Sequence, residues 1–190
     1  MKRTNPIAAL ALGAAAALGA ATAVQSALAA DAPKPAAAPA APKADAGANV
    51  VKPTADVKNW RLEQHEEAKA TIAAADGAIV FDVTKEDGTD WHVQAFQTPV
   101  ELKNQQAYVV TFQAKADAER AVKVQAGIDE EDWHPVGLDE EVTLGKEWKA
   151  YEYKFTAEDV KPVKNRIGFV LGQAKGKVYV KDLVVKPAPK

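Results

Sequence analysis

The stretch "AYVVTFQAKA" at residues 107–116 decides the fold class, because its side chains alternate between two kinds. Tyr108, Val110, Phe112 and Ala114 share one parity, and the residues between them are mainly polar. Successive side chains of a β-strand point to opposite faces. This period of two therefore predicts a strand that is buried on one side.

The same alternation returns along the rest of the chain, between turn signals such as "EDG", "KNQ" and "AKG". Other stretches of this kind are "AIVFDV" (78–83), "WHVQAF" (91–96), "AVKVQA" (121–126), "KAYEYKF" (149–155), "RIGFVLG" (166–172) and "KVYVKDLVV" (177–185). No βαβ alternation and no nucleotide-type glycine loop interrupts them. Several short alternating strands between turns predict an all-β fold, a two-sheet antiparallel β-sandwich.

The chain before these strands divides into two parts. Residues 1–29 carry Lys2 and Arg3, then an apolar run, then a small-residue exit at Ala27-Leu28-Ala29, which predicts a secretory signal peptide. Residues 30–56 are an Ala/Pro-rich linker without aromatic residues, and we expect it to be disordered. The globular domain is expected at residues 57–187, in a protein that is secreted or periplasmic.

Composition excludes several classes of function. The chain has no cysteine, and Ser26 in the predicted signal peptide is its only serine, so thiol and serine nucleophiles are absent from the mature domain. The formal net charge is −2, without a basic cluster. This argues against nucleic acid and against an anionic membrane surface as partners.

One strand carries an unusual set of polar and aromatic side chains. In "TDWHVQAFQ" (89–97), one parity holds Trp91, Val93 and Ala95, and the other holds His92, Gln94 and Phe96. If the first set is inside, the second lies on an outer sheet face, where an aromatic ring, an imidazole and an amide suit a sugar. The other interpretation is that Trp91 belongs to the core and the polar residues are ordinary cross-strand neighbours.

The remaining tryptophans differ in their surroundings. Trp133 follows three acidic residues in "EEDWHPVGL" (130–138), which favours a loop at the sandwich rim and a ligand platform. Trp60 and Trp148 stand at expected strand entries, where we expect them to pack in the core.

The domain also resembles a known family over residues 59–187. The segments that carry the resemblance are "NWRLE", "DGAIVFDVT", "GTDWHVQAFQ", "AYVVTFQAKAD", "RAVKVQ", "DWHPVGL", "VTLGKEWKAYEYKFTA", "NRIGFVLG" and "GKVYVKDLVV". As a set they are similar to the carbohydrate-binding modules of the family 4/9 type, which accompany many secreted polysaccharide-degrading enzymes. The resemblance implies a galactose-binding-like jelly roll, with a β-glucan or xylan chain in a cleft on a concave sheet face.

The resemblance also implies which residues face the ligand. By position these are Trp91, His92, Gln94, Gln125, Trp133 and Arg166. Arg166 has the opposite parity to Ile167 and Phe169, which puts it outside the core, where a surface ion pair is the other interpretation. Many family members hold a structural calcium, for which Asp182 is the one matching candidate ligand. The family's N-terminal calcium motif is missing from this chain.

Two functions of different classes remain open from the sequence. The first is a secreted, non-catalytic protein that binds a polysaccharide. The second is a jelly-roll module that has lost its sugar and binds another envelope protein through the same face. A glycosidase is disfavoured because the acidic pairs in "DEEDW" and "DEEV" have no fixed separation across a cleft. The three histidines His65, His92 and His134 lack the short spacing of metal ligands.

Overall fold

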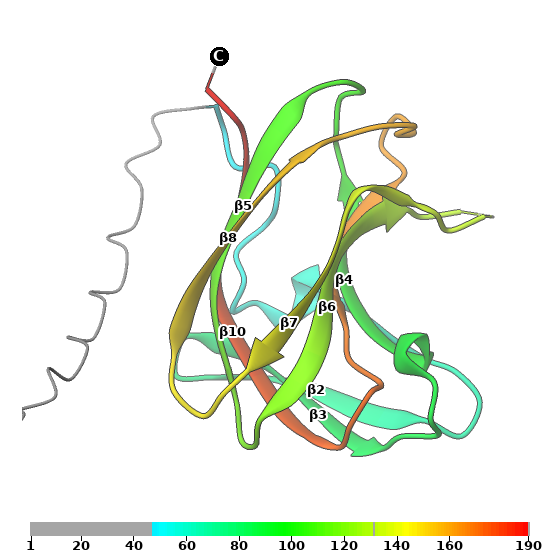
Figure 1. Ribbon diagram of the computed structural model, residues 1–190, viewed down its shortest axis with the longest axis vertical. Helices are drawn as coiled ribbons and strands as arrows, with labels where there is room; N and C mark the ends of the chain where they lie inside the picture. The colour runs from blue at the N-terminus through cyan, green and yellow to red at the C-terminus, as the bar shows by residue number, and fades with distance from the viewer. Residues whose placement is uncertain (1–46, 131, 190) are drawn as a thin grey trace, which may run out of the picture. The chain divides into compact units, whose positions relative to one another are not determined.

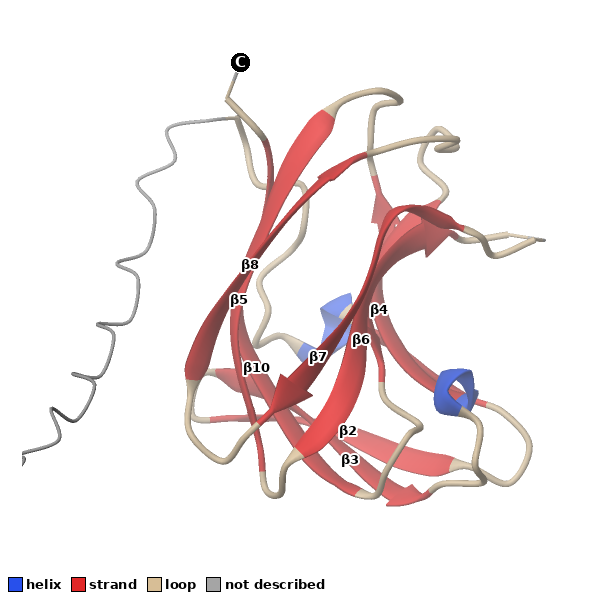
Figure 2. Ribbon diagram, in the orientation of Figure 1, coloured by secondary structure: helices blue, strands red, loops and turns tan. Residues whose placement is uncertain are grey.

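A computed structural model describes residues 47–130 and 132–189. Two five-stranded antiparallel sheets face each other, with two short 3₁₀ turns, so the predicted all-β sandwich is confirmed (Figures 1 and 2). The predicted signal peptide and residues 30–46 of the predicted linker lie outside the described residues. Within the described part of the chain, no helix is long and apolar enough to cross a membrane.

The two sheets are called the front sheet and the rear sheet. The front sheet has the order β1 (Arg61–Gln64), β4 (Val93–Val100), β9 (Asn165–Val170), β6 (Arg120–Ile128) and β7 (Pro135–Leu144). The rear sheet has the order β2 (Lys69–Ala75), β3 (Ala78–Lys85), β10 (Gly176–Pro187), β5 (Ala107–Ala116) and β8 (Lys149–Thr156). The 3₁₀ turns are η1 (Val57–Asn59) and η2 (Asp90–His92).

The core lies between the inner faces of the two sheets. The predicted inward set of β5, which runs from Tyr108 to Ala114, is buried, as is the alternating set of β6. The Trp60 ring packs edge-on against Phe81 at 5.2 Å and is stacked on Phe169 at 6.1 Å. Its indole Nε1 donates a hydrogen bond of 2.8 Å to the Thr54 carbonyl. The prediction that Trp60 belongs to the core is therefore confirmed.

The prediction that Trp148 belongs to the core is wrong. Trp148 directly precedes β8 and is partly exposed, and Lys115 and Lys181 place their ammonium groups over its ring. Residue 149 pairs with Ala114 of β5, which points inward, so the position before it has the opposite, outward parity. Trp148 therefore lies on the outer face of the rear sheet.

The folded domain begins earlier than the predicted boundary at residue 57. Residues 49–54, which we call the strap, are hydrogen-bonded to strands of both sheets. Asn49 Oδ1 accepts from the Val185 amide at 2.9 Å, and Thr54 Oγ1 accepts from the Leu183 amide at 2.8 Å. The Lys52 amide donates to Gln97 Oε1 at 2.8 Å. The strap thus belongs to the sandwich, although its composition resembles that of the linker before it.

Asp182 does not have the surroundings of a calcium ligand. It lies at a register shift of β10, with φ of 55°, and its Oδ2 accepts a hydrogen bond from Gln113 at 3.0 Å. Calcium takes six to eight oxygen ligands. Among residues 47–130 and 132–189, no group of three or more acidic or histidine side chains is placed to hold a metal. The residues present do not fit the calcium that the resemblance implied.

Candidate functional site

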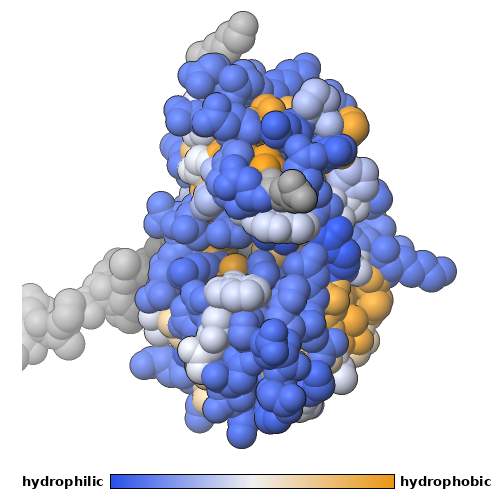
Figure 3. Space-filling view, turned by 90° about the vertical axis from the view of Figure 1, so that its right-hand side faces the viewer, coloured by the Kyte–Doolittle hydropathy of each residue, from blue (hydrophilic) through white to orange (hydrophobic). Residues whose placement is uncertain are grey.

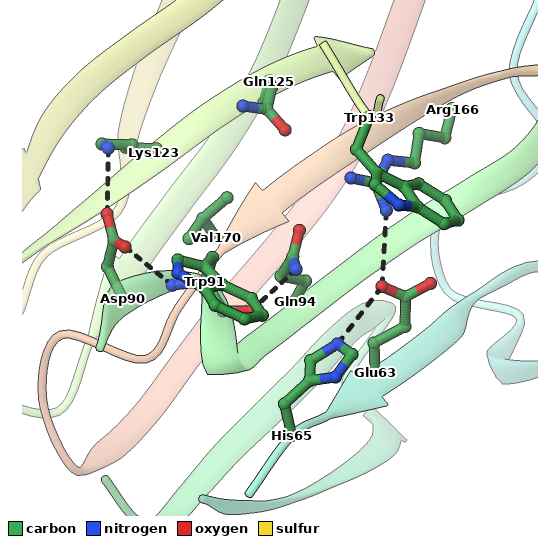
Figure 4. Close-up of a pocket in the computed structure, with 10 residues that line it drawn as sticks. All are labelled: Glu63, His65, Asp90, Trp91, Gln94, Lys123, Gln125, Trp133, Arg166 and Val170. Carbon is green, nitrogen blue, oxygen red and sulfur yellow. Dashed lines mark hydrogen bonds and ion pairs between the residues drawn. The ribbon is translucent and has the colours of Figure 1, made fainter. Parts of the chain in front are cut away.

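A cleft of about 550 Å³ lies on the outer face of the front sheet. Figure 3, which views this side of the molecule, shows a hollow between the upper and lower halves of the surface. Ten residues line the cleft: Glu63, His65, Asp90, Trp91, Gln94, Lys123, Gln125, Trp133, Arg166 and Val170 (Figure 4). They come from β1, β4, β6 and β9 and from the segments that adjoin these strands.

The floor of the cleft follows from the strand register. Gln94 of β4 pairs with Glu63 of β1 on one side and with Val170 of β9 on the other, and Val170 pairs with Lys123 of β6. These four residues form one row across the sheet and share its outer face. Three of the four are polar, and Val170 is the one apolar side chain of the row.

A second row lies two residues further along the strands. It contains Arg61, Phe96, Gly168 and Gln125. A Cβ on Gly168 would meet the carbonyl oxygen of Ala95 at 2.0 Å, so only glycine allows β9 to lie this close to β4. As a result, no side chain rises between Phe96 and Gln125 at this point of the floor.

Arg166 crosses the floor between two aromatic rings. Its Cζ lies 4.1 Å from the centroid of the Phe96 ring and 5.0 Å from that of Trp133, and Figure 4 shows the indole lying across the guanidinium. Nη1 donates to Glu63 Oε2 at 3.3 Å. The side chain is almost fully buried, and this desolvation lowers the pKa of Arg166. Its parity was predicted correctly, but it is a supporting group under the cleft wall rather than a surface ion pair.

Trp133 forms one wall of the cleft. Its side chain is 49% exposed, and its backbone and that of Asp132 have positive φ values of 49° and 84°. Non-glycine residues adopt this region only when their surroundings hold them there. The stack on Arg166, together with the hydrogen bond from the Trp133 amide to the Glu130 carbonyl, holds this indole.

Trp91 forms the wall near η2. Its side chain is 50% exposed, so the interpretation that it belongs to the core is wrong. The His92 ring meets the indole edge-on at 4.2 Å, and the His65 ring lies 5.3 Å away. Gln94 Nε2 donates to the Trp91 carbonyl at 2.7 Å. Two imidazoles therefore contact the indole and one amide holds its backbone, while the residue stays half exposed.

His92 does not line the cleft, contrary to its predicted position. The residue ends η2 instead of lying in a strand, so the alternation starts only at Val93. From there on the predicted parity holds: Val93 and Ala95 are in the core, and Gln94 and Phe96 face the other side. His92 Nδ1 is 2.7 Å from Asp87 Oδ2, and the ring supports Trp91 from outside the cleft.

The charged residues of the cleft are paired. Lys123 Nζ lies 2.9 Å from Asp90 Oδ2, and this hydrogen bond lowers the pKa of Asp90 and raises that of Lys123. Glu63 is paired with Arg61 at 2.7 Å as well as with Arg166. The cleft therefore offers polar groups without a large excess of either charge.

Five of the six residues predicted from the sequence lie together around this cleft: Trp91, Gln94, Gln125, Trp133 and Arg166. Sequence reasoning missed Glu63, His65, Asp90, Lys123 and Val170. Parity was a usable signal for two of them, because Lys123 has the parity of Gln125 and Val170 has the parity of Arg166. Glu63 gave no such signal, since its strand is only four residues long.

Comparisons with known proteins point to one family. The family model described as "Carbohydrate binding domain" matches residues 53–176. A solved structure described as "CBM4 structure and function" has a TM-score of 0.63 and 24% identity, with 67% of this chain and 86% of that chain covered. The second N-terminal cellulose-binding domain of Cellulomonas fimi β-1,4-glucanase C has a TM-score of 0.61 and 19% identity. The match covers 79% of this chain and 100% of that domain.

A third similar structure combines two modules. It is the Clostridium thermocellum xylanase 10B CBM22-1-GH10 structure in complex with xylohexaose, with a TM-score of 0.51 and 13% identity, covering 75% of this chain and 29% of that chain. At these identities the likeness establishes the fold. No curated protein sequence matches this chain.

Proposed function

We propose a function for the cleft from one premise: the chain belongs to the carbohydrate-binding domain family whose model it matches over residues 53–176. The cleft on the front sheet binds a polysaccharide chain of the β-glucan or xylan class, without chemical change to the polymer. The protein acts outside the cytoplasm, in the periplasm or beyond the cell, as residues 1–29 predict.

One observation carries this proposal. Trp91 and Trp133 are each about half exposed and line a single cleft, together with the amides of Gln94 and Gln125. Sugar rings have apolar C–H faces that pack on indoles, and hydroxyl groups that need both donors and acceptors. A primary amide supplies both from one side chain. The cleft thus has the groups that a neutral sugar chain requires.

The polymer class is supported by the descriptions of similar structures. The Cellulomonas fimi domain is named as a cellulose-binding domain, and the Clostridium thermocellum structure holds xylohexaose. Both ligands are β-1,4-linked chains of neutral sugars. The charged side chains of this cleft also suit a neutral sugar chain, because Glu63, Asp90, Lys123 and Arg166 are already in ion pairs with each other or with Arg61.

The carboxylates of the cleft support binding rather than glycoside hydrolysis. A glycosidase needs one carboxylic acid whose pKa is raised so that it can donate a proton. Here the hydrogen bond from Lys123 lowers the pKa of Asp90. Asp90 therefore lacks the surroundings of a general acid. Glu63 forms ion pairs with both Arg61 and Arg166.

Affinity electrophoresis of the purified chain tests the proposal, in gels that contain xylan, mixed-linkage β-glucan, mannan or no polymer. We expect retardation by xylan or β-glucan, and its loss in Trp133→Ala. Trp148→Ala is the matched control, because it removes a partly exposed tryptophan of the rear sheet. Loss of retardation in Trp148→Ala but not in Trp133→Ala would contradict the assignment of the cleft.

The same gels separate the proposal from its competitor. A folded chain that migrates equally in every gel would contradict sugar binding by the cleft. The front face would then be better explained as a docking surface for an envelope protein, the second function that the sequence left open. Circular dichroism of each variant verifies that it is folded.

A further inference from the structure

The outer face of the rear sheet carries a row of aromatic and basic side chains that the cleft does not use. Lys115 of β5 pairs with Tyr179 of β10, and Trp148 directly precedes Lys149, which is the partner of Ala114. Trp148, directly before β8, thus lies beside Lys115 of β5, which lies beside Tyr179 of β10, and the three strands are neighbours (Figure 1). All three are partly exposed.

The side chains of this row lean toward each other. Lys115 Nζ lies 5.2 Å from the centroid of the Trp148 ring and 5.1 Å from that of Tyr179, and the two rings are 6.5 Å apart at 73°. Lys181 Nζ lies 4.4 Å from the Trp148 ring. One indole therefore has two ammonium groups beside it. We call Lys115, Trp148, Tyr179 and Lys181 the rear row.

The charge of the rear row is not neutralised within the described part of the chain. Neither Lys115 nor Lys181 forms an ion pair with a carboxylate of residues 47–130 and 132–189. The carboxylate of Asp182 accepts a hydrogen bond from Gln113. Two like charges at one ring repel each other, and an anion between them would relieve that repulsion. The whole chain has a net charge of −2, so this positive charge is local.

We propose that the rear row is a second glycan-binding surface, and that its ligand is an acidic polysaccharide whose sugars carry carboxylates. The exposed parts of the Trp148 and Tyr179 rings would pack against the C–H faces of the sugars. Lys115 and Lys181 would pair with the carboxylates. This inference goes beyond the function proposed for the cleft, and it does not depend on that function, because the residues belong to the opposite sheet.

The choice of an acidic glycan rests on the contrast with the cleft. In the cleft Lys123 is bonded to Asp90 and Arg166 to Glu63, so the cationic side chains are already paired. In the rear row the cations face rings instead of carboxylates. A cation–π contact at an exposed site is weak, so the ammonium group stays free to bind an anion as well.

The test uses gels that contain polygalacturonate, and the purified full chain. The informative variant is the double substitution Lys115→Gln and Lys181→Gln, whose matched control is Lys58→Gln with Lys103→Gln. The control removes two exposed lysines outside the rear row, so its net charge changes equally. Trp148→Ala tests the ring, and Trp133→Ala tests the cleft.

We expect polygalacturonate to retard the unmodified chain, and the apparent dissociation constant to rise at least fivefold in the rear-row double variant and in Trp148→Ala. The control pair and Trp133→Ala should keep the retardation. Added salt should weaken it, since the Debye length falls from about 10 Å at 0.1 M to about 3 Å at 1 M.

Three results would overturn the inference. The first is no retardation of a folded chain by polygalacturonate. The second is an equal loss in the control pair, which would mean that net charge alone is responsible. The third is a loss of retardation in Trp133→Ala while the rear-row variants are still retarded, which would mean that the acidic polysaccharide binds in the cleft. Failure here leaves retardation by neutral xylan or β-glucan unchanged, so the two proposals are tested separately.

Discussion

The outer faces of the front and rear sheets both carry tryptophans, but they present them differently. On the front sheet, Trp91 and Trp133 belong to η2 and to the segment between β6 and β7, so they stand above the strands as walls. On the rear sheet, Trp148 and Tyr179 lie in register with a lysine between them. Walls enclose a cleft, whereas a row of this kind leaves an open surface.

The two faces also differ in how their cations are held. The Arg166 guanidinium is buried between Phe96 and Trp133 and is bonded to Glu63. The ammonium groups of Lys115 and Lys181 reach their rings from a partly exposed surface. On the front sheet the buried Arg166 supports a wall of the cleft. On the rear sheet the partly exposed Lys115 and Lys181 give the surface a local positive charge. The two faces therefore differ in the charge that they present beside their aromatic rings.

Among the variants considered, Arg166→Ala should have the largest effect on stability and on binding at the front sheet. It removes the support of Trp133 and leaves Glu63 with one cation fewer, at a cost on the order of 3 kcal/mol for a broken buried pair. We expect a lower midpoint in urea unfolding and the loss of retardation by xylan or β-glucan.

Arg166→Lys separates charge from shape in the same position. Lysine keeps the positive charge but lacks the planar group that stacks between two rings. If the lysine variant binds the neutral polymer as well as the unmodified chain does, the stack is not what holds Trp133 in place.

A smaller loss is expected from Trp91→Ala. An aromatic contact contributes about 0.5–1.5 kcal/mol beyond the area that it buries, which corresponds to a weakening of roughly twofold to thirteenfold. Titration calorimetry with a soluble xylan or β-glucan oligosaccharide measures it. His92→Ala should have a weaker effect in the same direction, because that ring supports Trp91 without lining the cleft. An equal or larger effect of His92→Ala would mean that His92 contacts the sugar.

Thr54→Val should change stability and leave both faces intact. The variant removes the hydroxyl that accepts a hydrogen bond from the Leu183 amide, which is buried. Such a bond contributes about 1 kcal/mol, and we expect urea unfolding to show a decrease of that size. Retardation by neutral and acidic polymers should be unchanged. A loss of binding on either face would show that the strap also positions that face.

The smallest effect is expected from Asp90→Asn, in the pH dependence of stability. The folded-state pKa of Asp90 is lowered by Lys123, so this pair stabilises the fold above the unfolded pKa of the carboxyl, about 3.9. The contribution is lost as the pH falls through the folded-state pKa. Thermal unfolding from pH 6 to pH 2 should therefore decline less steeply in the variant than in the unmodified chain. Equal slopes would mean that the pair contributes nothing to the acid sensitivity.

The sequence was sufficient for most of the fold because burial on one side of a strand imposes a period of two. The alternation of Tyr108, Val110 and Phe112 predicted β5 with its observed bounds. β7 did not show the pattern, because Pro135 and Gly137 occupy its start and three acidic residues follow in succession. β2 was missed as well, since most of its residues are alanines, whose burial is not evident from their chemistry.

The site was predictable where strands determine it and less so where turns do. Parity places Gln94, Gln125 and Arg166 on the outer faces of their strands, and the family resemblance implied that they face the ligand. His92 was misplaced because a 3₁₀ turn precedes β4, and no residue pattern marks the point at which alternation begins. The partners of Arg166 depend on contacts between β9, β4 and the Trp133 segment, which lie far apart in the sequence. Such long-range contacts have no local signature.

The strap has a mechanical consequence. A pull on the chain at residue 49 loads the bonds to Val185, and then those of Lys52 and Thr54, in series. Val185 belongs to β10, which lies in the middle of the rear sheet between β3 and β5. Tension on a tether attached here is therefore delivered to the most enclosed strand of that sheet rather than to an edge that could peel away. The bond from the Lys52 amide to Gln97 would also carry part of that load to β4 of the front sheet, the strand whose Gln94 lines the cleft.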